Sequence, residues 1–195
     1  SVTVGAGTAT AHTLTLTGAI NTTPTNVATA GGTVVLESAG GGIATTAATG
    51  TITTTGNTTG AGGEVFIHHI AGATGTITLN SNITTRGGVG GNGGVVTVLN
   101  DQGSIVANGV TNVSLGTGGA ADGTIQMQAA GSITGTGTFV GDTTGTLVAR
   151  TTNTTGDGRI SLPGGVLGTT TEANTGNAMA NAVFQTATLS TTALD

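Results

Sequence analysis

The sequence predicts an all-β fold, a parallel β-helix of about five to six three-sided coils. Three observations favour it. A unit of about 31 residues recurs along the chain, short segments alternate apolar and polar residues, and Gly and Thr take the place of residues that favour helices. A unit this small cannot bury its own apolar face, so successive units must stack on one another.

The recurring unit begins with a turn that leads into a strand with two apolar residues spaced by two. Its copies lie at residues 31–36, 62–67, 93–98, 122–127 and 157–162, which makes Gly32, Gly63, Gly94, Gly123 and Gly158 equivalent. The pairs Asn92-Gly93, Asp122-Gly123 and Asp157-Gly158 predict turns with positive φ before the strand.

Each unit contains three segments with strand-like alternation, and three strands close one triangular coil. We expect strands at residues 34–38, 43–46 and 51–55, then 65–70, 76–80 and 82–86, then 96–100, 104–107 and 112–115, and finally 125–129, 132–134 and 138–140, with an extra piece near 147–148. Equivalent strands of successive coils then pair in parallel about 4.8 Å apart.

The apolar positions predict which side chains stack inside. Two interior columns are expected on the first side, Val34, Val65, Val96, Ile125, Ile160 and Leu36, Ile67, Val98, Met127, Leu162, and one on the second side, Ile43, Ile77, Ile105, Ile133. The outward columns are Val35, Phe66, Thr97, Gln126, Ser161 and Glu37, His68, Leu99, Gln128, Pro163. A slip of one residue would turn the apolar columns outward, so the register is well specified.

The repeat divides the chain into three regions. Residues 1–30 form an N-terminal strand or cap region with strand-like pieces at 2–4 and 14–16, and residues 31–167 carry the repeats. Residues 168–195 are a C-terminal tail, which is compatible with a cap or with a strand that joins another subunit. Within the tail, residues 177–185 are compatible with a short helix or an extended segment.

Composition excludes several classes of function. The net charge is −5 and the chain has only three Lys or Arg residues, so no basic patch exists for nucleic acid. No run of about 18 apolar residues occurs that would span a membrane as a helix. There is no Cys, which excludes disulfides and thiolate metal sites.

The segment 88–98, read as Gly-Val-Gly-Gly-Asn-Gly-Gly-Val-Val-Thr-Val and followed by Gly103-Ser104-Ile105, resembles the repeats of filamentous-haemagglutinin-type adhesins. The resemblance covers roughly residues 30–165. It implies a right-handed parallel β-helix in a secreted, surface-exposed protein, typically bacterial. The chain is far shorter than those exoproteins and lacks their recognisable secretion domain, which is compatible with a fragment or with a small subunit that reuses the same coil.

His68 and His69 are the strongest candidates for a site. Adjacent residues on a strand point to opposite faces, so His68 is expected outside, one coil above Glu37, and His69 near a corner. One carboxylate and one imidazole are too few ligands for a metal site. We therefore interpret Glu37 and His68 as neighbours in an outward column of side chains, without a metal.

The remaining motifs favour structure over chemistry. The pattern Gly88-x-Gly90-x-x-Gly93 formally matches a dinucleotide fingerprint, but a strand follows it where a helix is required. The eight acids (Glu37, Glu64, Asp101, Asp122, Asp142, Asp157, Glu172 and Asp195) fall mostly in turns and form no expected catalytic pair. Thr-x-Thr pairs at 51/53, 76/78 and 134/136 are typical of ice-binding solenoids, but the third unit interrupts the array with Ser104 and Val106.

These observations predict a structural protein with no catalytic, cofactor or metal site. We expect an extracellular, self-assembling filament or fibre subunit, part of a surface appendage or biofilm matrix, whose partner is a further copy stacked head to tail. The two ends favour this, because residues 1–30 and 173–194 contain no charged side chain that would protect an open sheet edge. The alternative is an adhesin segment of a larger secreted exoprotein that binds glycans or host surfaces.

Overall fold

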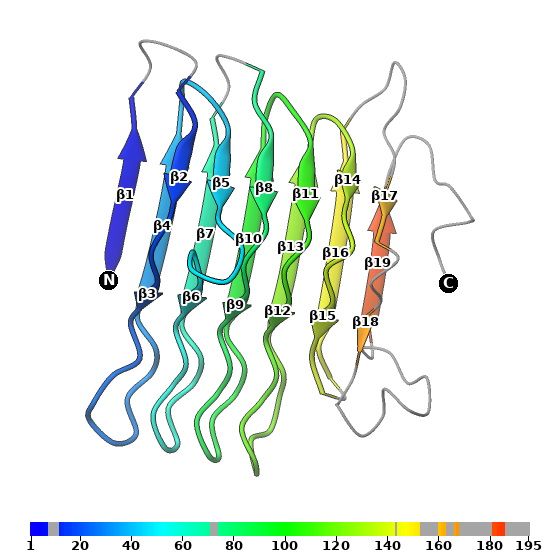
Figure 1. The fold of residues 1–195 in the computed structure, drawn as a ribbon. Helices are drawn as coiled ribbons and strands as arrows, with labels where there is room; N and C mark the ends of the chain where they lie inside the picture. The colour runs from blue at the N-terminus through cyan, green and yellow to red at the C-terminus, as the bar shows by residue number, and fades with distance from the viewer. Residues whose placement is uncertain are drawn as a thin grey trace.

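The computed structural model is a β-solenoid in which three parallel sheets enclose one apolar interior (Figure 1). It describes residues 1–7, 12–70, 74–142, 144–152, 160–162, 166–167 and 181–185. The all-β solenoid expected from the repeat is therefore confirmed. Among these residues no helix is long and apolar enough to span a bilayer.

The chain visits the three sheets in turn, so each coil contributes one strand to each sheet. The first sheet contains β1 (Val2–Ala6), β4 (Thr33–Ser38), β7 (Glu64–His69), β10 (Val95–Asn100), β13 (Thr124–Ala129), β16 (Thr146–Thr151) and β19 (Asn181–Gln185). The second contains β2 (Leu14–Leu16), β5 (Ile43–Thr45), β8 (Ile77–Leu79), β11 (Ile105–Ala107), β14 (Ile133–Thr134) and β17 (Ile160–Ser161). The third contains β3 (Ile20–Asn21), β6 (Ile52–Thr53), β9 (Ile83–Thr84), β12 (Thr111–Asn112), β15 (Phe139–Val140) and β18 (Val166–Leu167).

The expected register holds through the first four repeats. Val34 pairs with Val65, Val65 with Val96, and Val96 with Ile125. On the second sheet, Ile43, Ile77, Ile105 and Ile133 pair in the same way, and all of these side chains are almost completely buried. The alternation of buried and half-buried residues along each strand is what places the apolar residues in columns.

The fifth copy of the repeat is not where the sequence places it. Ile125 pairs with Leu147, and Met127 pairs with Ala149, so β16 occupies the place expected for residues 160–162. Ile160 instead continues the second-sheet column above Ile133, and Leu162 leaves the expected first-sheet column with it. The connection between β15 and β16 spans only residues 141–145, whereas the earlier coils make a long loop at this point, as Figure 1 shows. A constant repeat length of about 31 residues therefore places the fifth first-sheet strand too late in the sequence, at a strand that belongs to the second sheet.

The first thirty residues form a coil of the same stack. β1, β2 and β3 pair in register with β4, β5 and β6, and β3 is a strand that the alternation pattern did not indicate. At the other end, residues 181–185 are extended and form β19 beside β16, while residues 177–180 lie outside the described part of the chain.

Paired glycines let neighbouring coils approach closely where the chain returns to the first sheet. A Cβ on Gly62 would lie 1.7 Å from the carbonyl oxygen of Thr85, and one on Gly93 would lie 1.8 Å from that of Val113. The expectation of positive φ is wrong for Gly93 and Gly123, because among the described glycines only Gly90, Gly118 and Gly135 have positive φ. Residues 157–159 lie outside the described residues. Gly62 and Gly93 therefore need to be glycine because a larger residue has no space.

Candidate functional site

The outer face of the first sheet carries most of the chemically distinctive side chains. One outward column contains Val35, Phe66, Thr97, Gln126 and Val148, and the other contains Glu37, His68, Leu99, Gln128 and Arg150. Ser161 does not close the first of these columns, where the sequence had predicted it. Ser161 pairs with Thr134 in the second sheet, and Pro163 lies outside the described residues.

His68 lies beside Glu37 in the register, as expected, but its polar partner comes from the coil on the other side. Its Nε2 atom lies 3.0 Å from Oδ2 of Asp101, and its ring meets Phe66 edge-on at 5.7 Å between centroids. The two partners are 20% and 37% exposed, so the pair contributes about 0–1 kcal/mol to stability. Within the described part of the chain, no group of three metal-ligating side chains forms here or elsewhere.

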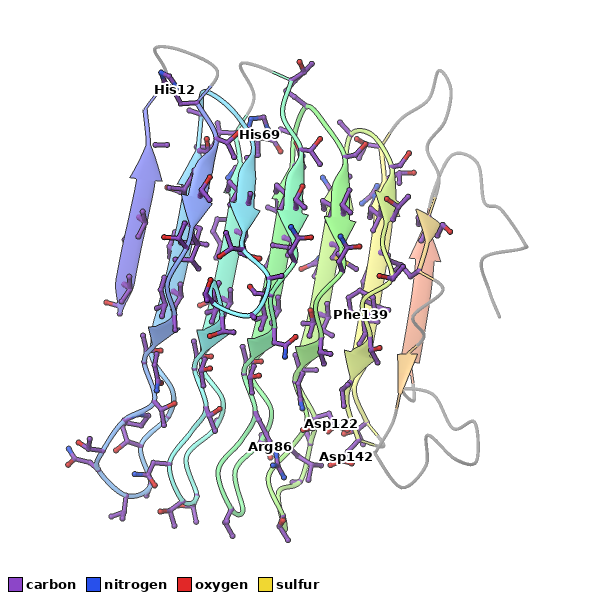
Figure 2. All side chains as sticks on the ribbon, viewed as in Figure 1. His12, His69, Arg86, Asp122, Phe139 and Asp142 are labelled. Carbon is purple, nitrogen blue, oxygen red and sulfur yellow. The ribbon has the colours of Figure 1, made fainter. Side chains whose placement is uncertain are left out.

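His69 is fully buried at the corner between the first and second sheets, where Figure 2 labels it. Its Nδ1 atom lies 3.0 Å from Oδ1 of Asn100, the next residue in the same column. Nε2 has no hydrogen-bond partner among the described residues. The expected position near a corner is confirmed. The hydrogen bond to Asn100, one coil further along, makes this histidine part of the corner structure.

Asn100 organises that corner. Its Nδ2 group donates to the carbonyl oxygens of Gly75 and Ser104, both at 2.9 Å. Its Oδ1 atom also accepts from the amides of Gln102 and Gly103. The side chain is 2% exposed, so a buried amide satisfies backbone groups that a sharp corner would otherwise leave unpaired.

Asp122, an acid away from this face, holds two loops together. Asp122 accepts from the amide of Leu115 through Oδ1 and from the amide of Thr144 through Oδ2. Figure 2 places Asp122, Asp142 and Arg86 toward the end of the molecule where the long loops lie, and Arg86 donates to the carbonyl oxygen of Leu115. Asp157, Glu172 and Asp195 lie outside the described residues.

The glycine-rich segment 88–93 is built into the neighbouring loops. The amide of Gly88 donates to the carbonyl oxygen of Gly60, and the amide of Gly90 donates to that of Thr117. The strand β10 follows the segment, so no helix N-terminus is present to receive a phosphate. These amides hold neighbouring coils together. The segment therefore has a structural role, as expected from the sequence, and does not form a dinucleotide-binding loop.

The outward threonines do not form a continuous array. On the second sheet the outward column runs Thr15, Ala44, Thr78, Val106, Thr134, and on the third it runs Asn21, Thr53, Thr84, Asn112, Val140. Neither column keeps threonine through all five coils, which does not match the repeated threonine lattice of an ice-binding face.

The first coil offers a different kind of site, an open end. Within the described part of the chain, β1, β2 and β3 are the outermost strands of their sheets, each with a pairing partner on one side only. Their inward side chains Val4, Leu14, Leu16 and Ile20 are only partly buried, whereas their counterparts in the second coil, among them Leu36 and Ile43, are almost completely buried. This end is apolar inside, carries free backbone groups and has no charged side chain in residues 1–30.

No protein-family model, curated protein or solved structure matches this sequence. Two surfaces of the chain carry the features that bear on its function, the outer face of the first sheet and the open end formed by β1, β2 and β3.

Proposed function

We propose that this chain is a structural subunit of an extracellular self-assembling filament, with copies stacked head to tail. The observation that carries the proposal is the first coil. Three edge strands leave amide and carbonyl groups free, and four inward apolar side chains are half-covered. A further β-coil in the same register would satisfy both at once, and a second copy of the chain offers such a coil.

The symmetry of that contact favours a fibre. The two ends of a parallel stack differ, so an end-to-end contact between copies is heterologous and does not close on itself. Each copy would add its coils to three continuous sheets that run along the filament. The alternating interior columns fix the register, because a shift by one residue would place valine and isoleucine outside.

The composition is consistent with an exposed, long-lived material. The chain has no aromatic-rich surface, few charges and only three basic residues, which limits sites for proteases that cleave after Lys or Arg. Described polar groups in the loops are largely satisfied by neighbouring coils, as with Asn92, which accepts from the amides of Ala120 and Ala121. A location in a surface layer, appendage or biofilm matrix is part of the proposal.

Electron microscopy of the purified chain at rising concentration tests the proposal. We expect unbranched filaments with a reflection at about 4.8 Å from strand spacing along the axis. Leu16→Lys should abolish filaments, because it places a charge in the half-buried interior of the first coil. Thr15→Lys is the matched control, since Thr15 is exposed on the same strand. Monomers at every concentration, with a normal circular dichroism spectrum, both for the unmodified chain and for a variant in which β19 is displaced, would refute the proposal.

The same open coil is what an inner segment of a longer solenoid would present, which favours an adhesin segment as the second candidate. In that case the preceding coil belongs to the same polypeptide, and the outer face with Phe66 and His68 is the candidate contact surface for glycans. The length of the mature protein on the cell surface separates the two. A product with many further repeats supports the adhesin segment, and a product near the present length supports the filament.

A further inference from the structure

The last strand of the first sheet lies in the same columns as the first strand, shifted by one residue, because Ala182 shares the column of Val2. β1 and β19 each have five residues. Following the pairs from coil to coil, Thr3 shares its column with Val35, Phe66, Thr97, Gln126, Val148 and Val183. If another copy placed its β1 on β16, its Thr3 would face Val148, where Val183 lies now.

The three sheets do not end at the same level. Among the residues that the structure describes, the first sheet has seven strands, and the second and third have six each. A copy stacked on top of β19 would therefore leave the edges of β17 and β18 one strand short, a gap of about 4.8 Å on two of the three sides. A copy that took the place of β19 would set β1 on β16, β2 on β17 and β3 on β18, and all three sheets would continue without a gap (Figure 1).

The sequence after β19 is similar to the sequence after β1. Aligned with residues 8–16, residues 186–194 repeat Thr8, Ala9, Thr10, Thr13 and Leu16 as Thr186, Ala187, Thr188, Thr191 and Leu194. The C-terminal segment thus resembles the start of the first coil in sequence, with an alignment two residues out of step with the register, in which Val183 shares the column of Thr3.

From these three observations, and given the filament proposed above, we propose that β19 is a latch strand that occupies the binding site for the first coil of the next copy. Assembly then replaces β19 on β16 by β1 of that copy. The exchange of one five-residue parallel strand for another is nearly neutral in backbone hydrogen bonds. The driving force comes from pairing β2 with β17 and β3 with β18, and from covering Val4, Leu14, Leu16 and Ile20.

Cysteine pairs test the exchange directly, because the chain has no Cys of its own. Residues paired in register on neighbouring strands have Cα atoms within the range that a disulfide spans. The double variant Val148→Cys with Val183→Cys should form an intramolecular staple on oxidation. We expect the oxidised full-length protein to stay monomeric and the reduced protein to assemble. Val148→Cys alone is the control for the substitution.

Two further pairs identify the strand at the junction. Thr3→Cys with Val148→Cys should give covalent chains between copies on a non-reducing gel, since these positions lie about 24 Å apart within one copy and cannot join internally. Thr3→Cys with Val183→Cys should not. The spacing of subunits along the filament gives an independent reading, about 29 Å for six strand levels per copy against about 34 Å for seven.

The results of these experiments distinguish failure of the latch proposal from failure of the filament proposal. Chains that cross-link through positions 3 and 183, with a staple that does not prevent assembly, would overturn the latch and leave the filament intact. If the unmodified protein does not assemble, the full-length variant Ala182→Pro with Val183→Pro releases β19, because one of two consecutive amides faces β16. Assembly of that variant supports a closed latch, and its failure to assemble while folded would overturn both proposals.

Discussion

At the scale of single residues, one column shows a threonine hydroxyl where an apolar group would serve better. Thr22, Thr54 and Thr85 follow one another at the inner edge of the third sheet, and their hydroxyl oxygens have no hydrogen-bond partner among the described residues. Thr54 and Thr85 are fully buried. The next coil places Val113 at the equivalent position, also fully buried. The column therefore accepts a methyl group in place of the hydroxyl.

We expect Thr85→Val to raise the free energy of unfolding by about 1 kcal/mol, since it removes a buried hydroxyl without changing the side-chain volume. Urea denaturation followed by circular dichroism measures the change. Thr84→Val is the matched control, because Thr84 faces outward and should change stability by less than about 0.5 kcal/mol. A loss of stability for Thr85→Val would mean that the hydroxyl has an unrecognised partner.

Glycine acts at this scale through space. The Cβ of an alanine at position 62 would overlap the carbonyl oxygen of Thr85, which belongs to the backbone of the next coil and cannot rotate away. We expect Gly62→Ala to lower the free energy of unfolding by about 3 kcal/mol. Gly7→Ala should be close to neutral, because no atom lies within 4 Å of its added Cβ. Equal effects of the two substitutions on the melting temperature would contradict the close-approach explanation.

At the scale of elements, the corner after β10 depends on one amide side chain. Asn100 bridges His69, two backbone carbonyls and two backbone amides, so it joins the end of β10 to the turn that leads into β11. A corner between two sheets exposes backbone groups to an apolar interior, and each buried group left unpaired costs about 1–3 kcal/mol. This network was not visible in the alternation pattern.

We expect Asn100→Ala to lower the free energy of unfolding by about 3 kcal/mol, because several partners lose their hydrogen bonds together. Asn108→Ala removes an exposed asparagine that contacts Asn80 and the amide of Thr136, and should cost less than about 1 kcal/mol. Chemical denaturation of both variants gives the comparison. A cost for Asn100→Ala as small as that of the control would show that water replaces the side chain.

At the scale of the whole molecule, stability should vary along the stack. Each coil contacts its neighbours on both sides except at the ends, so inner strands have two pairing partners and β1, β2 and β3 have one. This difference in local stability between inner and outer strands can also show where copies contact one another. The strands with free edges are those that the filament would cover.

We expect amide hydrogen exchange in the monomer to be slowest in β7 and β10 and faster in β1, β2 and β3. In the assembled protein, exchange in β1, β2 and β3 should slow by about tenfold or more, since their free edges gain a partner. Exchange mass spectrometry on peptides from residues 1–30 and 64–100, before and after assembly, measures both. Unchanged exchange in the first coil of a filament would place the contact on another surface.

The amino-acid sequence alone determined the fold class, the interior columns of the first four repeats and the outward direction of His68. Each of these follows from local patterns, a period of two within strands and a near-constant repeat between coils, because buried positions accept only apolar residues at those spacings. Recurrent Gly and Thr marked where strands end, although the reason for glycine at positions such as Gly93 is close packing and not positive φ.

Only the tertiary structure decided which strand comes fifth, what His68 contacts and where the C-terminal segment lies. Loop length changes the entropy of closure only slowly, so a coil can lose its long loop and place Leu147 above Ile125, 22 residues later, without a signal in the strands. His68 meets Asp101 across 33 residues, and β19 meets β16, because stacking brings distant segments into contact. Such contacts depend on the assembled coils, which no local pattern encodes.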